Sequence, residues 1–155
     1  MIKYISRGFL LGIFLFLAPF FSVYSQIAEV MDGVLDVPEL SYAQAARFVL
    51  AASETLPVAV SAGEAFMYAR QQNWIPGAAQ AEGPITMGAL SLLIMKSFKI
   101  PGGFMYALFP SGRYAYRTMV RRSFIDGVAD QAMRVSGEEF FLILGNVLSY
   151  KGGDN

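Results

Sequence analysis

The chain has 155 residues, of which 55% are hydrophobic and 15% charged, and its 12 basic and 12 acidic side chains give no formal net charge. It contains neither cysteine nor histidine, which excludes disulfides and thiolate metal sites and removes the usual general base and thiol nucleophile of enzymes. The balanced charge also argues against nucleic-acid binding, for which a clustered positive excess is expected. We therefore predict a non-catalytic protein that uses no metal or other cofactor.

The first 25 residues have the pattern of a secretory signal peptide. Lys3 and Arg7 precede a nearly uncharged run, Phe9–Tyr24, which is shorter than the roughly 20 residues needed to span a bilayer. Val23 and Ser25 stand at the positions of small residues before a cleavage site. We expect cleavage and export to the periplasm or cell surface, with an uncleaved anchor as the alternative. The mature chain would keep the 12 acidic residues and lose two of the 12 basic ones, leaving a net charge of −2.

Residues 61–98 align with residues 111–148 at a constant offset of 50, without a gap. Such self-similarity indicates tandem structural repeats. The conservative pairs include Trp74 with Phe124 and Ile85 with Val135. The identical pairs are Ser61/Ser111, Ala65/Ala115, Ile75/Ile125, Gly77/Gly127, Ala79/Ala129 and Leu92/Leu142. Each copy predicts a helix, a glycine-containing loop and a second helix.

In the first copy, Ser61 with Glu64 three residues later is typical of a capping box that opens a helix. This helix is expected to run to Asn73 and to be stopped by the Pro76–Gly77 pair. Thr86 would cap the second helix, whose apolar residues recur at helical spacing.

The second copy follows the same plan. Ser111 would cap a helix that includes residues 114–122, and Asp126 with Gly127 would turn the chain. Ser136 with Glu139 predicts another capping box.

A partial third copy precedes both. Leu40–Ser41 aligns with the residues before and at the caps of the other two copies, and Gln44 completes a capping box. We therefore predict an all-α fold of about two and a half helix–loop–helix repeats, which bury a shared core because one hairpin cannot bury its apolar face alone. The expected organisation is a lead-in at 26–37, a helical repeat domain at 38–150 and a flexible tail at 151–155.

This pattern resembles the S-layer homology domain, in which a helix, a glycine-containing loop and an aliphatic–Thr/Ser pair opening a second helix commonly recur three times. The similar stretches are residues 40–53, 74–98 and 124–148. The resemblance covers roughly residues 38–148 and implies a small helical bundle with pseudo-threefold symmetry.

The resemblance also implies binding of cell-wall polysaccharide through an Ile-Thr-Arg-Ala-Glu-like signature, whose arginine meets an acidic sugar substituent. The matching stretches here are Leu40–Gln44, Ile85–Ala89 and Val135–Glu139. None of them contains the arginine, so the shape of the motif is present without its ligand-reading residue.

The second copy carries a candidate binding surface. Arg113, Arg117 and Arg121 recur at i, i+4 and i+8 of one predicted helix, with Arg122 beside them. Their planar groups suit the carboxylate or phosphate of a glycan, a lipid headgroup or an acidic partner. The alternative is a solvated face paired with nearby acidic side chains. These are Asp126, Asp130 and Glu138.

The connection from Lys99 to Gly112 is unusually apolar for a loop and includes Phe104, Tyr106 and Phe109. It is expected either to fold into a short helix under the bundle or to present an apolar patch to a membrane or a partner. The only tryptophan, Trp74, precedes the first copy's turn and suits a core plug at the helix end, with sugar stacking as the minority interpretation.

The leading hypothesis is an exported module of the bacterial envelope that docks to another envelope protein through the basic stripe or the apolar connection. The alternative is direct binding of cell-wall polysaccharide or peptidoglycan. Membrane contact is expected only through an uncleaved leader or through Phe104–Phe109, and no nucleic-acid partner is expected.

Overall fold

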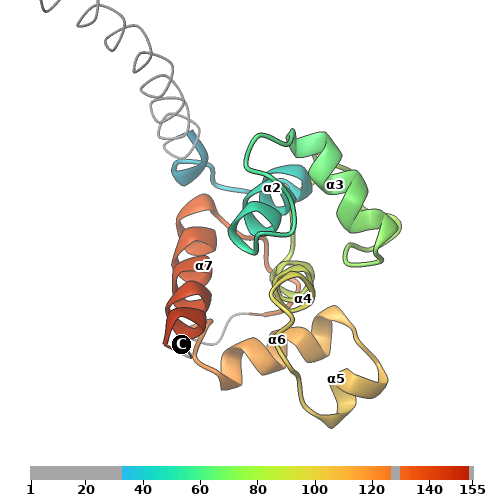
Figure 1. The fold of residues 1–155 in the computed structure, drawn as a ribbon, viewed down its shortest axis with the longest axis vertical. Coiled ribbons are helices and arrows are strands. Elements are labelled where there is room, and N and C mark those ends of the chain that lie inside the picture. Colours follow the sequence, from blue (N-terminus) through green and yellow to red (C-terminus); the bar gives the residue numbers. More distant parts are fainter. Residues whose placement is uncertain (1–32, 127–129, 154–155) are drawn as a thin grey trace, which may run out of the picture. The chain divides into compact units, whose positions relative to one another are not determined.

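The computed structural model describes residues 33–126 and 130–153. The leader predicted at 1–25 and most of the lead-in lie outside these residues. The described helices are α2 (Tyr42–Ala52), α3 (Ala62–Gln71), α4 (Met87–Ser97), α5 (Phe104–Leu108), α6 (Gly112–Arg121) and α7 (Gly137–Gly152) (Figure 1). Apart from two isolated bridges, the regular structure of the described residues is helical, which confirms the all-α class. None of these helices has the length and apolarity needed to cross a bilayer.

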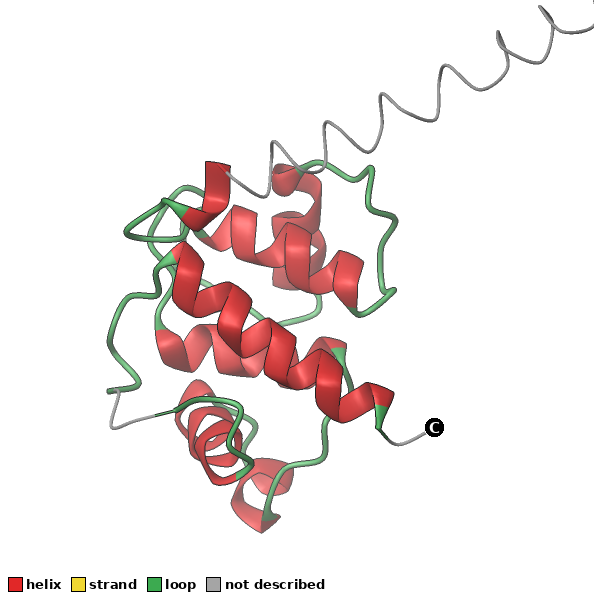
Figure 2. Cartoon of the chain, turned by 90° about the vertical axis from the view of Figure 1, so that its left-hand side faces the viewer, coloured by secondary structure: helices red, strands yellow, loops and turns green. Residues whose placement is uncertain are grey.

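The chain divides into two compact units, residues 1–34 and residues 35–155. The helices α2 to α7 all belong to the second unit. At its centre lies α4, whose residues are all buried except Lys96. Helices α2 and α6 pack against α4 (Figure 1), and α7 lies across one face of the unit (Figure 2). The aromatic rings of Phe48 on α2 and of Phe140 and Phe141 on α7 contact one another.

Hydroxyl side chains begin most of these helices, as predicted. At four N-caps the hydroxyl oxygen accepts a hydrogen bond from the backbone N–H three residues later, which satisfies one of the donors that a helix start leaves open. These caps are Ser41, Ser61, Thr86 and Ser136. The reciprocal bond of a full capping box forms at Ser41 and Ser61 but not at Ser136.

Ser111 departs from this pattern, since it occupies the N-cap position of α6 but its side chain makes no cap hydrogen bond. Its φ is −136°, whereas the other four caps have φ between −92° and −67°. The helix start is therefore held by its packing against α4 and not by its own cap.

Helices α3 and α6 end within two residues of the predicted Asn73 and Arg122, but the residues that stop them differ from the prediction. In α3 and α6 the chain turns at Asn73 and Ser123, which have φ of 57° and 58°, well before the glycines at 77 and 127. The next N–H donates back into the helix, from Trp74 to the Ala69 carbonyl at 2.9 Å and from Phe124 to the Met119 carbonyl at 3.0 Å. A left-handed residue with this backward bond is a common helix stop that glycine usually fills.

Three residues far apart in the sequence form a closed ring of backbone hydrogen bonds. The N–H of Leu40 donates to the carbonyl of Val135 at 2.7 Å, that of Val135 to Ile85 at 3.2 Å, and that of Ile85 to Leu40 at 2.8 Å. All three side chains are fully buried. Each residue directly precedes a helix cap, so the ring joins the starts of α2, α4 and α7.

Helix α7 extends into the predicted tail, because Lys151 and Gly152 are helical and Gly153 forms the C-cap. The sequence of α7 contains no proline, and the helix continues through Gly145 to the glycines at 152 and 153. Residues 154 and 155 lie outside the described part of the chain.

Candidate functional site

The three arginines Arg113, Arg117 and Arg121 lie exposed along α6. The ion pair found among the described residues joins Arg134 to Glu39. Among these residues, none of the three arginines is therefore paired with an acidic side chain. The predicted pairing with Asp126, Asp130 or Glu138 is therefore not found. The α6 face keeps its positive charge available for an external anion.

The connection before α6 forms the short helix α5, as one of the two alternatives predicted. Only Tyr106 turns inward, at 9% exposure, while Phe104 is 76% and Phe109 is 62% exposed. Met105 and Leu108 are also exposed. The helix therefore forms, but three of its large apolar side chains and that of its C-cap residue Phe109 face outward in the way that the second alternative predicted.

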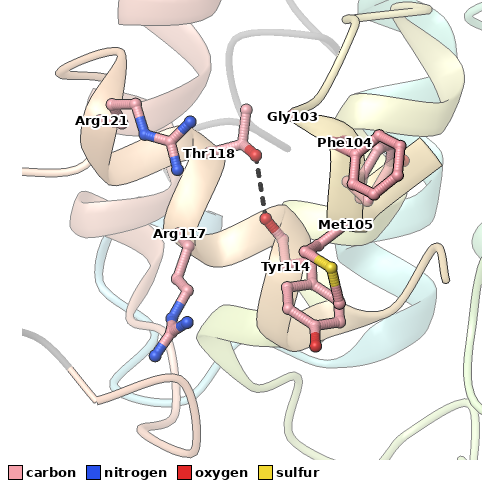
Figure 3. Close-up of a pocket in the computed structure, with 8 residues that line it drawn as sticks. Gly103, Phe104, Met105, Tyr114, Arg117, Thr118 and Arg121 are labelled. Carbon is pink, nitrogen blue, oxygen red and sulfur yellow. Dashed lines mark hydrogen bonds between the residues drawn. The ribbon is translucent and has the colours of Figure 1, made fainter. Parts of the chain in front are cut away.

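Helices α5 and α6 enclose a pocket of about 180 Å³ (Figure 3). One wall is apolar and comes from α5, and the other comes from α6. Its lining residues are Gly103, Phe104, Met105, Tyr106, Tyr114, Arg117, Thr118 and Arg121. The Thr118 hydroxyl donates to the Tyr114 carbonyl at 2.9 Å and is thereby satisfied within the helix. The guanidinium groups of Arg117 and Arg121 extend in different directions (Figure 3).

A second hollow of about 250 Å³ continues along α6 and is lined by Arg113, Tyr116, Arg117, Asp130 and Gln131. Arg117 belongs to both hollows. We call the surface formed by the two hollows and the exposed side chains of α5 the α5–α6 face.

The sequence prediction had not included Tyr114 and Thr118. With Arg117 and Arg121 they fall at i, i+3, i+4 and i+7, the spacing of one helix face. This spacing in the sequence is enough to predict that Tyr114 and Thr118 share a helix face with the two arginines. The recurrence of arginine at every fourth position does not reveal them.

Tyr106 anchors α5 at an energetic cost. Its hydroxyl is buried and has no hydrogen-bond partner, and this burial raises the pKa of its phenol above the ordinary value. The Lys96 ammonium lies 5.7 Å from the centre of the ring. An unsatisfied buried hydroxyl of this kind costs about 1–3 kcal/mol.

We therefore expect Tyr106→Phe to raise the free energy of unfolding by about 1 kcal/mol, measured by denaturant unfolding near neutral pH. The advantage of the variant should widen above the ordinary tyrosine pKa of 10.0. There the unfolded wild-type chain ionises this phenol more readily than the folded chain, so wild-type stability falls as the pH rises. A loss of stability in Tyr106→Phe would show that the hydroxyl has a partner.

Arg122 was predicted to join the basic stripe, and the structure gives it a different role. Its guanidinium donates to the Tyr150 hydroxyl at 2.8 Å and to the Pro101 carbonyl at 3.0 Å, and it lies 5.4 Å from the centre of the Tyr150 ring. It thus ties the end of α6 to the end of α7 and to the connection before α5. Adjacency in sequence places Arg122 on a different side of the helix from Arg121, since successive residues are rotated by about 100°.

We expect Arg122→Ala to lower the free energy of unfolding by about 1 kcal/mol, because two exposed hydrogen bonds and a ring contact are lost. Arg113→Ala, which removes an exposed arginine without such bonds, should stay within about 0.5 kcal/mol of the wild type. Thermal and denaturant unfolding of both variants provide the comparison. Equal losses in the two would contradict the structural role of Arg122.

Trp74 does not line either hollow of the α5–α6 face. It is half-buried, and its ring meets that of Tyr68 edge-on at 5.9 Å. Its counterpart Phe124 is more deeply buried and meets Tyr150 edge-on at 5.3 Å. A buried core position at the helix end was predicted for Trp74, but Phe124 occupies such a position more fully than Trp74 does.

A third groove, of about 370 Å³, lies where the starts of α4 and α6 meet. It contains Thr86, Gly88 and Ala89 from the start of α4 and Arg113 from α6. The remaining lining residues are Pro76, Leu92, Ser111, Gly112, Gln131 and Ala132. The start of α4 thus lines an open groove to which α6 supplies an arginine.

No group of three or more potential metal-ligating side chains occurs among the described residues. Comparison of the chain with protein-family models, with curated proteins and with solved structures returns no match.

Proposed function

We propose that this protein is a non-catalytic docking module of the bacterial cell envelope, which binds an acidic partner protein through the α5–α6 face. The observation that carries the proposal is the combination of three unpaired α6 arginines with the outward apolar side chains of α5. Arginine, phenylalanine and methionine are enriched at protein interfaces, and buried contacts of this kind supply most of their binding energy. Export to the periplasm or cell surface is part of the proposal and rests on the leader-like segment before residue 26.

The proposal is tested by photo-cross-linking in cells that express the full chain. A benzophenone amino acid in place of Phe104, which is 76% exposed, should give a discrete adduct with another envelope protein. The same group in place of Leu142, which is 58% exposed on α7, serves as the matched control. The Phe104 adduct should disappear when Arg117 and Arg121 are both replaced by Gln. Identical adducts from both positions would contradict docking through this face.

A second candidate, direct binding of cell-wall glycan, is favoured by a separate observation. The backbone ring joins Leu40, Ile85 and Val135, which are the equivalent positions of the three predicted copies, and this supports the pseudo-threefold symmetry that the resemblance to the S-layer homology domain implies. The groove beside Thr86 and Gly88 contains Arg113, which supplies a positive charge where the signature lacks one. We propose this function as the alternative.

Glycan binding predicts that the purified protein sediments with cell-wall sacculi and that Arg113→Gln weakens this sedimentation at least tenfold. Arg121→Gln is the control, because Arg121 does not line this groove. Protein that stays in the supernatant would exclude the alternative.

A further inference from the structure

The pocket between α5 and α6 places one cation beside an apolar wall. A terminal nitrogen of Arg121 lies against Gly103 at the start of α5, within 3.4 Å of where a Cβ on that glycine would stand. Phe104 and Met105 follow directly and supply the apolar lining. Arg121 makes no ion pair within the described residues. A ligand in this pocket therefore meets a positive group and hydrocarbon at the same time.

The size of the pocket limits what it holds. Its volume of about 180 Å³ is that of one large side chain, which is small for a whole ligand site of about 300–1,000 Å³. The arginine fork matches a carboxylate with two parallel hydrogen bonds. Arg117 is exposed and also lines this pocket.

We propose that this pocket recognises a partner segment in which a carboxylate stands next to an aromatic or aliphatic side chain. The carboxylate binds Arg121, with Arg117 as the second donor, and the apolar side chain packs on Phe104 and Met105. This inference rests on the proposed function, because it names the chemistry that the α5–α6 face recognises in its partner.

A concave pocket favours a protein segment over a lipid surface. A bilayer would contact the projecting rings of Phe104 and Phe109 but would leave a hollow of one side chain unfilled.

The test uses the purified full chain and a probe that carries both features, 3-phenylpropionate. Its neutral isostere 3-phenylpropanamide has nearly the same shape and no charge. The acid should shift the backbone amide resonances of Tyr114 and Thr118 saturably at about millimolar concentrations, as expected of a ligand of this size. The amide should bind at least tenfold more weakly. Arg121→Gln should weaken binding of the acid at least tenfold, and an unchanged circular dichroism spectrum would show that the fold is retained.

Arg47→Gln is the matched control, since Arg47 lies on α2 and lines neither this pocket nor the second hollow of the α5–α6 face. It should bind the acid as the wild type does. Equal binding of acid and amide would overturn the proposal, and so would equal losses in Arg47→Gln and Arg121→Gln, which would indicate unspecific attraction to positive charge. Binding to phosphatidylglycerol vesicles but not to phosphatidylcholine vesicles, without binding of the acid, would assign the pocket region to a membrane surface and also overturn it.

The two proposals fail separately. If the Phe104 cross-link persists while the acid does not bind, the α5–α6 face docks a partner but does not recognise a carboxylate in this pocket. If the acid binds while no cross-link forms, the pocket is an acid site and docking through this face is wrong.

Discussion

Replacing Phe140 by alanine is expected to lower the free energy of unfolding by about 3–5 kcal/mol, the largest effect of any substitution considered for this chain. The Phe140 side chain is fully buried. Its ring centre lies 6.1 Å from that of Phe48 on α2 and 5.1 Å from that of Phe141 on α7. Truncation would remove buried hydrocarbon and leave a cavity between the two helices, which the surrounding side chains fill only in part.

The control for this prediction lies two residues further along the same helix. Leu142 is 58% exposed, so Leu142→Ala should change the free energy of unfolding by no more than about 0.5 kcal/mol. Denaturant unfolding of the two variants shows how much of the change in the free energy of unfolding comes from loss of burial. Alanine is a favourable helix residue at both positions, so helix propensity affects both variants alike. A comparable loss in both would show that Phe140 is not part of a packed core.

Gly112→Ala is expected to destabilise the protein by about 1–3 kcal/mol, although alanine normally stabilises a helix relative to glycine. A Cβ at Gly112 would stand 2.9 Å from the carbonyl oxygen and 3.0 Å from the carbonyl carbon of Gly88. These are backbone atoms of α4, where Gly88 also donates its N–H to the Gln131 carbonyl at 2.8 Å. The starts of α4 and α6 would have to separate to admit the methyl group.

Gly63 provides the matched comparison. It also stands in the first turn of a helix, but a Cβ there would meet nothing within 4 Å. Gly63→Ala should therefore raise the free energy of unfolding by up to about 1 kcal/mol. Measured in parallel with Gly112→Ala, the two substitutions should shift the unfolding midpoint in opposite directions. A gain in both would contradict the close approach of α4 and α6.

Local chemistry made the helix starts predictable from the sequence. A hydroxyl followed three residues later by Gln or Glu satisfies backbone donors in any surrounding, so Ser41 and Ser61 could be assigned without knowledge of the fold. The helix ends were predicted to within two residues, but the residues that stop the helices were not, because left-handed Asn73 and Ser123 are not the glycines that usually signal a stop.

The candidate site was predictable only in its residue types. The spacing of Arg113, Arg117 and Arg121 placed them on one helix, but whether acidic side chains neutralise them depends on packing between helices. The same holds for Arg122, whose partners Pro101 and Tyr150 lie 21 and 28 residues away. The connection from Lys99 to Gly112 was predicted to form either a short helix or an exposed apolar patch. It forms both, because Tyr106 is the one large side chain of α5 that turns inward.

The ring through Leu40, Ile85 and Val135 bears on how the chain tolerates shortening. In an open solenoid a terminal repeat can be trimmed while its neighbours stay folded, because each repeat contacts only the next. Here the bond from Leu40 to Val135 spans 95 positions, so a chain that ends before Val135 and thus lacks α7 would leave the buried Leu40 N–H and Ile85 carbonyl without these hydrogen-bond partners. Such a truncated chain should lose its structure throughout, and the segment from α2 to α7 should melt as one cooperative block.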